Sequence, residues 1–282
     1  MRAMPLAAVP SQSASTAALA TVADPILSVN GVTLQYTTQE SVVTASFRVS
    51  FDVHRADRYV LLGPSGCGKS TLLKAIGGFI DPVEGVISVG GRKVRGPGPD
   101  RMMVFQEFDQ LMPWKTVEEN ITYPMLVSGR FPKSEITDRA RRFIAKVKLE
   151  KFRDSYPHML SGGMKQRVAI ARGMAMEPDV LLMDEPFAAL DALTRRQMQQ
   201  ELLELWDETR FTVIFVTHSI EEAVFVGSRV LLLSPHPGQV RAELNCHHLG
   251  MAEQGTPEFG RLCKDINDML FDKQLPEDCS HG

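Results

Sequence analysis

Three runs of hydrophobic residues along the chain are continuous rather than alternating. They read YVLLG from Tyr59, DVLLMD from Asp179 and TVIFVTH from Thr212. Strands that are buried on both faces of a parallel sheet have this pattern. A helical pattern follows each run. The sequence therefore predicts an α/β fold with a mainly parallel core sheet wrapped by helices.

Earlier parts of the chain carry strand patterns of another kind. The stretch ILSVNGVTLQY from Ile26 offers two β-like runs around an Asn30-Gly31 turn, and SVVTASFRVSFDV and GVISVGGRKV are also rich in β-forming residues. We expect them to form an antiparallel β subdomain beside the core sheet.

Strand patterns are missing between about Thr116 and Pro157. The segment PKSEITDRARRFIAKVKLEKF instead has one apolar helical stripe, made by Ile136, Ala140, Phe143, Ile144 and Val147. This pattern predicts a helical subdomain inserted at about residues 116–165.

A last helix is predicted near the end of the chain. In TPEFGRLCKDINDMLF, Thr256 can cap the helix and Pro257 can be its first residue. The apolar face is formed by Phe259, Leu262, Ile266 and Leu270. We divide the chain into residues 1–25, 26–235 as the main domain, and 236–282 as a C-terminal strand and helix extension.

The first 25 residues contain one arginine and an alanine-rich stretch, as a signal peptide does. Their apolar part is broken by Pro5, Pro10 and a cluster of Ser, Thr and Gln residues, so we expect a disordered tail. No apolar run approaches the ~20 residues that a membrane-spanning helix needs.

Charge and cysteine content narrow the function classes. The net charge of −3 gives no reason to expect a nucleic-acid partner. The four cysteines are far apart in sequence, which favours a reducing compartment; they are Cys67, Cys246, Cys263 and Cys279. Cys246 stands beside His247 and His248, but no second ligand pair at zinc spacing accompanies them.

The strongest motif is GPSGCGKST, which follows a predicted strand and precedes a predicted helix. It matches G-x-x-x-x-G-K-[ST] and consists of Gly63, Pro64, Ser65, Gly66, Cys67, Gly68, Lys69, Ser70 and Thr71. Backbone N–H groups of such a loop surround the phosphates of a nucleotide. We expect Lys69 to reach the terminal phosphates, Ser70 to bind Mg²⁺, and a bulky adduct on Cys67 to block binding unless the nucleotide protects it.

Polar residues end two of the predicted buried strands. Asp184 can hold Mg²⁺ through water, since ligands bind beyond the carboxyl ends of parallel strands. Glu185 follows it and can polarise an attacking water; the alternative is a solvated loop charge. His218 ends another strand on the same edge, where it is either part of the site or an ordinary core or surface histidine.

The stretch LSGGMKQR places Ser161, Gly162 and Gly163 before a helix. One interpretation is a simple N-cap by Ser161. The other is a helix start opened by glycine so that a phosphate can approach its N–H groups. Together with the first loop, the second interpretation predicts a head-to-tail homodimer in which each copy supplies these residues to ATP held by the other.

In order along the chain, these motifs resemble those of the ATP-binding cassette (ABC) ATPases. They are the Walker A loop GPSGCGKST, the Q-loop VFQE with Gln106, the signature LSGGMKQR, the Walker B strand VLLMDEP, the D-loop ALD with Asp191, and the H-loop with His218. The resemblance covers residues 26–234 and implies a P-loop NTPase fold that binds ATP and Mg²⁺. It also implies that Gln106 touches the metal and the water, that His218 contacts the γ-phosphate, that Tyr36 stacks on adenine, and that Asp191 belongs to the nucleotide site.

The stretch GPGPDRMMVFQEFDQLMPWKTVEENI resembles, more narrowly, the ATPase subunits of importers for nitrate, sulfonates such as taurine, and related small solutes. This implies a peripheral subunit on the cytoplasmic face of the inner membrane, paired with a separate permease and, indirectly, with a periplasmic or extracellular solute-binding protein. The family's permease helix docks at Phe108–Val117. Met112, Pro113 and Trp114 there indicate a contact surface, or else pack locally on the helical insert.

Other ATPase classes fit less well. A GTPase would need N-K-x-D, which does not occur. A chromosome ATPase would have long heptad insertions, and a translation-factor ATPase would have two cassettes. An importer of another small organic solute, and a soluble ABC ATPase without a transport role, remain as alternatives.

Overall fold

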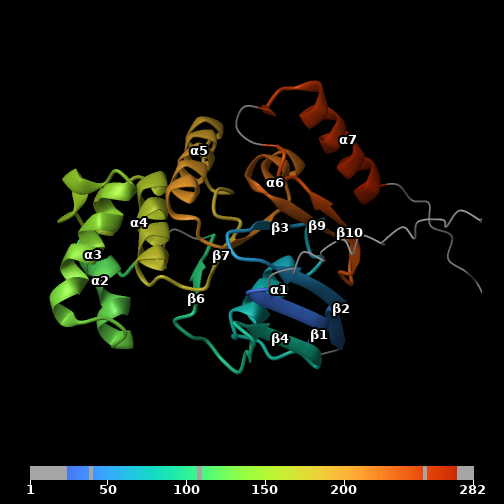
Figure 1. The fold of residues 1–282 in the computed structure, drawn as a ribbon, viewed down its shortest axis with the longest axis horizontal. Helices are drawn as coiled ribbons and strands as arrows, with labels where there is room; N and C mark the ends of the chain where they lie inside the picture. The colour runs from blue at the N-terminus through green and yellow to red at the C-terminus, as the bar shows by residue number, and fades with distance from the viewer. Residues whose placement is uncertain (1–23, 38–40, 107–109, 250–252, 272–282) are drawn as a thin grey trace, which may run out of the picture.

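The computed structural model describes residues 24–37, 41–106, 110–249 and 253–271 of the 282-residue chain. A six-stranded sheet lies at its centre, in the order β10-β9-β3-β8-β7-β6 (Figure 1). All neighbours in it are parallel except β10, which pairs antiparallel with β9. The strands are β3 (Arg58–Leu62), β6 (Arg101–Val104), β7 (Val180–Asp184), β8 (Val213–Thr217), β9 (Arg229–Leu233) and β10 (Val240–Asn245).

The three continuous apolar runs form β3, β7 and β8, which confirms the α/β class with a mainly parallel core sheet. Their side chains are buried on both faces because a separate hydrophobic core lies on each side of the sheet. In β3, for example, Val60 and Leu62 belong to one core, and Tyr59 and Leu61 belong to the other. Successive side chains of one strand therefore pack into different cores. A polar substitution at any of these positions would disrupt the packing of one of the two cores.

A second, antiparallel sheet has the order β2-β1-β4-β5. Its strands are β1 (Leu27–Thr37), β2 (Val42–Val53), β4 (Glu84–Val89) and β5 (Arg92–Lys93). The expected Asn30-Gly31 turn is wrong, because β1 runs through it without a break. Gly31 has φ 59°, and the pairing with β2 shifts register between Val29 and Val32, which is a β-bulge. The left-handed conformation that Asn-Gly favours is used here to bend a strand rather than to reverse it.

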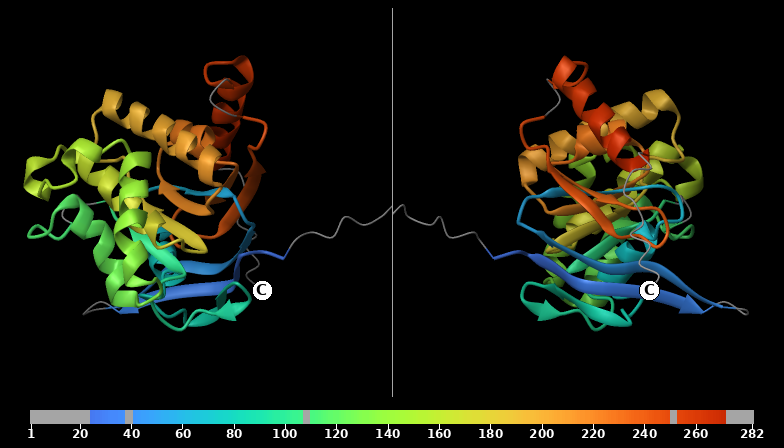
Figure 2. Two further views of the ribbon diagram at one scale, coloured as in Figure 1. Left: turned by 60° about the vertical axis from the view of Figure 1, so that its left-hand side comes forward. Right: turned by 90° about the vertical axis from the view of Figure 1, so that its right-hand side faces the viewer.

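Helix α1 (Lys69–Ile76) contributes Leu72, Leu73 and Ile76 to the core that the two sheets share. The opposite core is covered by α4 (Gly162–Ala175), α5 (Ala192–Thr209) and α6 (Ile220–Val226), which contribute most of their buried apolar residues to it. The central sheet therefore has helices on one face, and α1 with the antiparallel sheet on the other, as the views of Figure 2 show.

Between β6 and β7 the described chain is helical and lies to one side of the sheet (Figure 1). The elements are α2 (Val117–Ser128), α3 (Lys133–Lys146), α4 and the 3₁₀ turns η2 (Glu150–Phe152) and η3 (Pro157–Met159). Thr116 and Glu119 form a capping box at the start of α2. Ile136, Ala140 and Ile144 of the expected apolar stripe are buried in α3. None of the described helices is long and apolar enough to cross a membrane.

The C-terminal helix α7 (Pro257–Phe271) forms as predicted and packs against α6. The Thr256 hydroxyl accepts a hydrogen bond from the Phe259 N–H, and Phe259, Ile266 and Leu270 are buried. At the other end of the helix, the Arg241 guanidinium of β10 donates to the carbonyl oxygens of Met269 and Leu270. The first turn of the helix is therefore capped locally, and its last turn is tied to β10.

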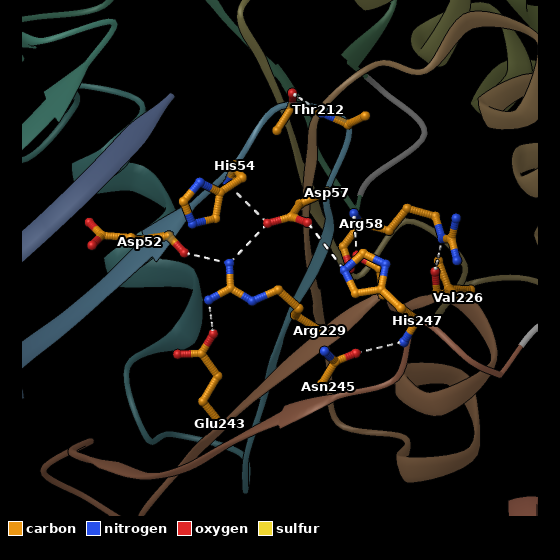
Figure 3. A network of polar contacts seen from close by, with 12 residues as sticks. Asp52, His54, Asp57, Arg58, Thr212, Val226, Arg229, Glu243, Asn245 and His247 are labelled. Carbon is orange, nitrogen blue, oxygen red and sulfur yellow. Dashed lines mark hydrogen bonds and ion pairs between the residues drawn. The ribbon is translucent and has the colours of Figure 1, made fainter. Parts of the chain in front are cut away.

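A polar network joins β9 and β10 to the turn before β3 (Figure 3). The carboxylate of Asp57, a residue that is only 4% exposed, accepts from the Arg229 guanidinium at 2.9 Å and from the His54 N–H at 2.9 Å. Arg229 also donates to the Asp52 carbonyl at 2.8 Å and forms an ion pair with Glu243. His247, just after β10, lies 3.7 Å from Asp57.

Replacing Asp57 should cost more stability than replacing Glu243. Asp57→Ala leaves the mostly buried Arg229 charge without its inner partner, and breaking a buried pair in this way costs about 3 kcal/mol. Glu243→Ala removes a more exposed carboxylate and should cost about 1 kcal/mol or less. Urea denaturation of both variants measures the difference; equal losses would show that the network does not depend on its buried acid.

Candidate active site

The phosphate loop connects β3 to α1, as its sequence predicts. Gly66 and Gly68 have φ values of 80° and 92°, a region that other residues rarely adopt. A Cβ atom on Gly68 would also lie 2.4 Å from the Ala45 carbonyl oxygen, so only glycine fits there. The first turn of α1 has no acidic residue. Its N-terminal N–H groups and positive dipole end can therefore attract an anion.

Lys69 is the first residue of α1 and is only 5% exposed. Its ammonium donates to the carbonyl oxygens of Gly63 at 2.7 Å and Pro64 at 2.9 Å. The side chain therefore curls over its own loop and places a positive charge inside it. An ammonium has three N–H donors, so a further one can serve a phosphate oxygen.

Ser70 and Asp184 meet across the gap between α1 and β7. The Ser70 hydroxyl donates to Asp184 Oδ1 at 2.7 Å. Burial raises the pKa of Asp184, the hydrogen bond from Ser70 opposes that shift, and the neighbouring Glu185 adds to it. A hydroxyl and a carboxylate are hard oxygen donors of the type that Mg²⁺ prefers, so the pair fits such an ion.

Glu185 and His218 form the next part of the same edge. Glu185 Oε2 lies 3.0 Å from His218 Nδ1, and the Glu185 N–H donates to the Val216 carbonyl. Glu185 has φ 43°, an uncommon conformation for a residue with a side chain. Both residues line a cavity of about 50 Å³, which is large enough for a water molecule. A carboxylate that faces such a cavity can orient a water and accept its proton.

Three residues at this cavity were not singled out from the sequence: Arg195 and Glu222, which line it, and Gln199, which contacts Glu222. Arg195 of α5 donates to the carbonyl oxygens of Phe187, Ala188 and Leu190, and so holds the loop that follows Glu185. The Gln199 amide donates to the Glu222 carboxylate at 2.7 Å. The only available signals were the i,i+4 spacing of Arg195 and Gln199 and the place of Glu222 one turn after His218. Both are ordinary features of solvated helices.

Glu222 should make the stability of the protein depend on pH. Burial raises its pKa above the ordinary value of 4.5, although hydrogen bonds from Thr217 and Gln199 oppose the shift. The folded state then binds this proton more tightly than the unfolded chain does. The stabilisation is complete below pH 4.5 and is lost as the pH rises through the raised pKa.

Glu222→Gln removes this titration. Its free energy of unfolding, relative to that of the wild type, should therefore increase as the pH is raised from about 4 to about 7. Glu221→Gln, the same substitution at the exposed neighbouring position, is the matched control. Parallel curves for Glu222→Gln and the wild type in urea denaturation would contradict a raised pKa.

The signature segment shows the predicted cap. The Ser161 hydroxyl accepts from the Met164 N–H at 3.3 Å at the start of α4. A Cβ on Gly163 would come within 3.1 Å of Thr194 at the start of α5, where Asp191 caps the helix. Hydrogen bonds from Thr194 lower the pKa of Asp191. Within the described chain, no hydrogen bond or ion pair connects Ser161, Gly162 or Gly163 to the phosphate loop.

The remaining expected residues lie on open surfaces. Tyr36 is 51% exposed near the end of β1, and Gln106 is exposed two residues after β6. Trp114 is 71% exposed, so the alternative that it packs locally on the helical insert is wrong. Phe108, at the start of the expected permease contact, lies outside the described residues.

The burial of Cys67 argues against the expected reaction at this residue. Its side chain is 1% exposed, and burial raises the pKa of its thiol. Only the thiolate reacts readily with thiol reagents, so both accessibility and ionisation disfavour the reaction. The side chain of Cys67 faces the protein interior rather than the phosphate side of the loop, because it belongs to the core between α1 and the sheets.

The asparagine Asn120 fixes the loop that carries Trp114. Its buried amide accepts from the Met112 N–H and donates to the carbonyl oxygens of Met112, Lys115 and Thr116. Trp114 is thus displayed on a loop of defined shape.

Comparison with known proteins gives one consistent result. The family model described as ABC transporter matches residues 47–188. The chain is 47% identical to a taurine import ATP-binding protein of Rhizobium johnstonii over 236 residues, which cover 81% of this chain and 89% of that protein. It is 41% identical to an aliphatic sulfonates import ATP-binding protein of Bacillus cereus over 214 residues, covering 76% and 83%.

Among solved structures, the fold is similar to that of a dimeric ATP-binding cassette in a post-hydrolysis state bound to ADP and Pi. The TM-score is 0.66 and the identity is 31%, over 78% of this chain and 98% of that chain. The family match includes the phosphate loop, the Ser70–Asp184 pair and Glu185, and together with the relatives it confirms the resemblance drawn from the motifs. The chain belongs to the ABC transporter family and is one of its ATP-binding, ATP-hydrolysing subunits.

Proposed function

We propose that this chain is the ATPase subunit of an importer for a small anion, and that the anion is a sulfonate such as taurine. The observation that carries the ATPase part is the convergence of the phosphate loop, Ser70–Asp184 and Glu185–His218 on one edge of the sheet. The solute class rests on relatives whose names specify taurine and aliphatic sulfonates. Residues 26–235 are the ATPase domain in this proposal, with a helical insert at about 116–165.

The roles of the site residues follow from their positions. The backbone of residues 63–71 and the Lys69 ammonium bind the phosphates of ATP. The exposed ring of Tyr36 stacks on the adenine base. Ser70, Asp184 and Gln106 would hold Mg²⁺, which neutralises charge on the phosphates when it is bound. Glu185 orients a water and accepts its proton, and His218, 3.0 Å away, holds that carboxylate in place.

Two copies of the chain complete the site by packing head to tail. The start of α4, with Ser161, and the start of α5, with Asp191, lie against one another through Gly163 and Thr194. Leu193 on this surface is 84% exposed and is available for an apolar contact with a second copy. In the proposed dimer this surface covers the ATP that the other copy holds, as supported by the dimeric form of the related cassette.

A permease contact is supported by a separate apolar surface. Trp114 precedes α2, and Tyr123, Leu126 and Val127 form an exposed stripe along that helix at i, i+3 and i+4 spacing. Exposed apolar side chains grouped in this way mark an interaction surface. We propose that they meet the permease on the cytoplasmic side of the membrane, where the subunit is peripheral.

Replacing Trp114 tests this contact. Trp114→Glu should remove an aromatic anchor worth about 2 kcal/mol or more, which corresponds to a roughly thirtyfold loss of affinity for the permease. Basal ATP hydrolysis should persist, because the residue touches no part of the nucleotide site. Copurification with the permease measures the effect, and Phe271→Glu, at a 63% exposed position on α7, is the matched control. Loss of basal hydrolysis, or unchanged copurification, would contradict the assignment.

The solute is tested by uptake into proteoliposomes that contain the subunit, its permease and its solute-binding protein. ATP-dependent uptake of taurine or an alkanesulfonate, competed by unlabelled sulfonate, is expected, with nitrate as the comparison anion. Uptake of an uncharged organic solute alone would contradict the anion class and leave the ATPase assignment intact. Absence of any permease association would instead favour a soluble ABC ATPase.

A further inference from the structure

A recess at the beginning of β6 and β7, the opposite ends of these strands from Gln106 and Asp184, is lined mainly by cationic side chains. It is about 380 Å³ in volume and lies where three parts of the molecule meet. Arg92 and Lys93 come from β5 of the antiparallel sheet, Arg101 begins β6 of the central sheet, and Arg130 lies between α2 and α3. Pro99, Asp100 and Asp179 complete the lining.

The charge of this recess has the opposite sign to that of the chain. Four cations face two carboxylates, an excess of two positive charges on a protein whose net charge is −3. Both carboxylates are already paired: Asp100 with Arg101 at 2.9 Å, and Asp179 with Arg55 at 3.9 Å. In the part of the chain that the structure describes, neither Arg92 nor Lys93 has a carboxylate partner. The positive potential is therefore not cancelled locally.

Arg101 gives the recess a fixed wall. Its side chain is only 6% exposed, and its two terminal nitrogens donate to Asp100 Oδ2 and to the Gly96 carbonyl. Its Nε is buried and has no acceptor among the described residues. Buried polar atoms without a partner are rare in folded proteins. Because this nitrogen is inaccessible to solvent, Arg101 contributes charge to the wall of the recess rather than a donor to a bound anion.

Arg130 brings the helical part of the chain to the same recess. Its guanidinium donates to the Pro99 carbonyl at 3.3 Å, which ties the turn after α2 to the segment that enters β6. The remaining N–H donors of this group stay available, since a guanidinium has five. Arginine forks bind the oxygens of phosphate and sulfate groups in pairs.

From this geometry we infer a second anion site, separate from the nucleotide site, which binds a small oxyanion with at least two negative charges through Arg92, Lys93 and Arg130. The volume is that of a small-molecule pocket and would hold roughly a dozen waters, whereas a flat basic patch would suit a nucleic acid or a membrane surface. The chemistry that it recognises is a phosphate or sulfate group, either as the free ion or as part of a phosphorylated metabolite. Because its ligands come from both sheets and from the α2–α3 connection, a bound anion would link these parts.

The test is calorimetric titration of the full chain with inorganic phosphate, at constant ionic strength maintained with chloride. Lys69→Ala serves as the background because it removes the main phosphate-binding charge of the nucleotide loop. We expect saturable binding at one site per chain in this background. Adding Arg92→Gln with Lys93→Gln should weaken it at least tenfold, and Arg130→Gln alone should weaken it severalfold.

A matched control removes the same two charges elsewhere. Lys151→Gln with Lys264→Gln changes exposed lysines on η2 and α7 and should alter the affinity less than twofold. Titrations with sulfate and with glucose 6-phosphate then show whether the free ion or a phosphorylated metabolite binds better; either result supports the site. Binding that disappears with Lys69→Ala, or that is weakened equally by the control pair, would overturn it. A thermal melt of each variant checks that it is folded.

Discussion

Glu185→Gln is expected to lower the rate of ATP hydrolysis by about 10²–10⁴-fold, the usual contribution of a general base. The substitution keeps the size of the side chain and removes its ability to accept a proton from a water bound in the adjacent cavity. Lys69, Ser70 and the phosphate loop are unchanged, so ATP affinity should stay within a few-fold of the wild type. The variant should therefore hold ATP without turning it over.

Size-exclusion chromatography with MgATP provides the second measurement for this variant. If ATP joins two copies of the chain, Glu185→Gln should elute as a dimer with ATP and as a monomer without it. Glu221→Gln is the matched control, because it removes the same charge from an exposed position on α6 and should change neither rate nor elution. Normal turnover by a strictly monomeric Glu185→Gln variant would contradict the role of Glu185.

Lys69→Ala should reduce hydrolysis by about 10²–10³-fold, comparable to the removal of one charged stabiliser from a reacting centre. It should also weaken ATP binding, in contrast to Glu185→Gln. The reason is the position of the ammonium inside the loop, where it is held by the carbonyl oxygens of Gly63 and Pro64. Lys74→Ala, at an exposed position on the same helix, is the control. Undiminished steady-state hydrolysis by Lys69→Ala would show that the loop does not hold the terminal phosphates in this way.

The core strands could be predicted because burial on both faces leaves a recognisable pattern in the residues of each strand. Strands β3, β7 and β8 need apolar side chains at every position, and this produces a local pattern. The conformation at Asn30-Gly31 could not be decided in the same way. A left-handed glycine serves both a turn and a bulge, and here the outcome depends on β1 pairing with β2 on one side and β4 on the other. Those partners are distant in sequence.

The same distinction applies to the site. Lys69, Ser70, Asp184 and Glu185 stand in contiguous motifs next to predicted strands, so their meeting at one edge followed from the order of elements. Arg195 and Glu222 belong to no such motif. Arg195 reaches back to the loop after Glu185 only once that loop has folded, and Glu222 meets Gln199 only where α6 comes close to α5. The burial of Cys67 was missed because the loop's sequence does not show which side chains turn inward.

The hydrogen bonds of Asn120 have a mechanical consequence. One buried amide ties both the N–H and the carbonyl of Met112, together with the carbonyls of Lys115 and Thr116, to the first turn of α2. The segment that displays Trp114 therefore has little freedom to bend independently. If the indole of Trp114 is displaced, we expect the loop and α2 to move together as one rigid body, with little bending of the loop. Since α2 packs on α4, whose first residues form the signature segment, a push at the surface and a shift at the start of α4 become parts of one motion.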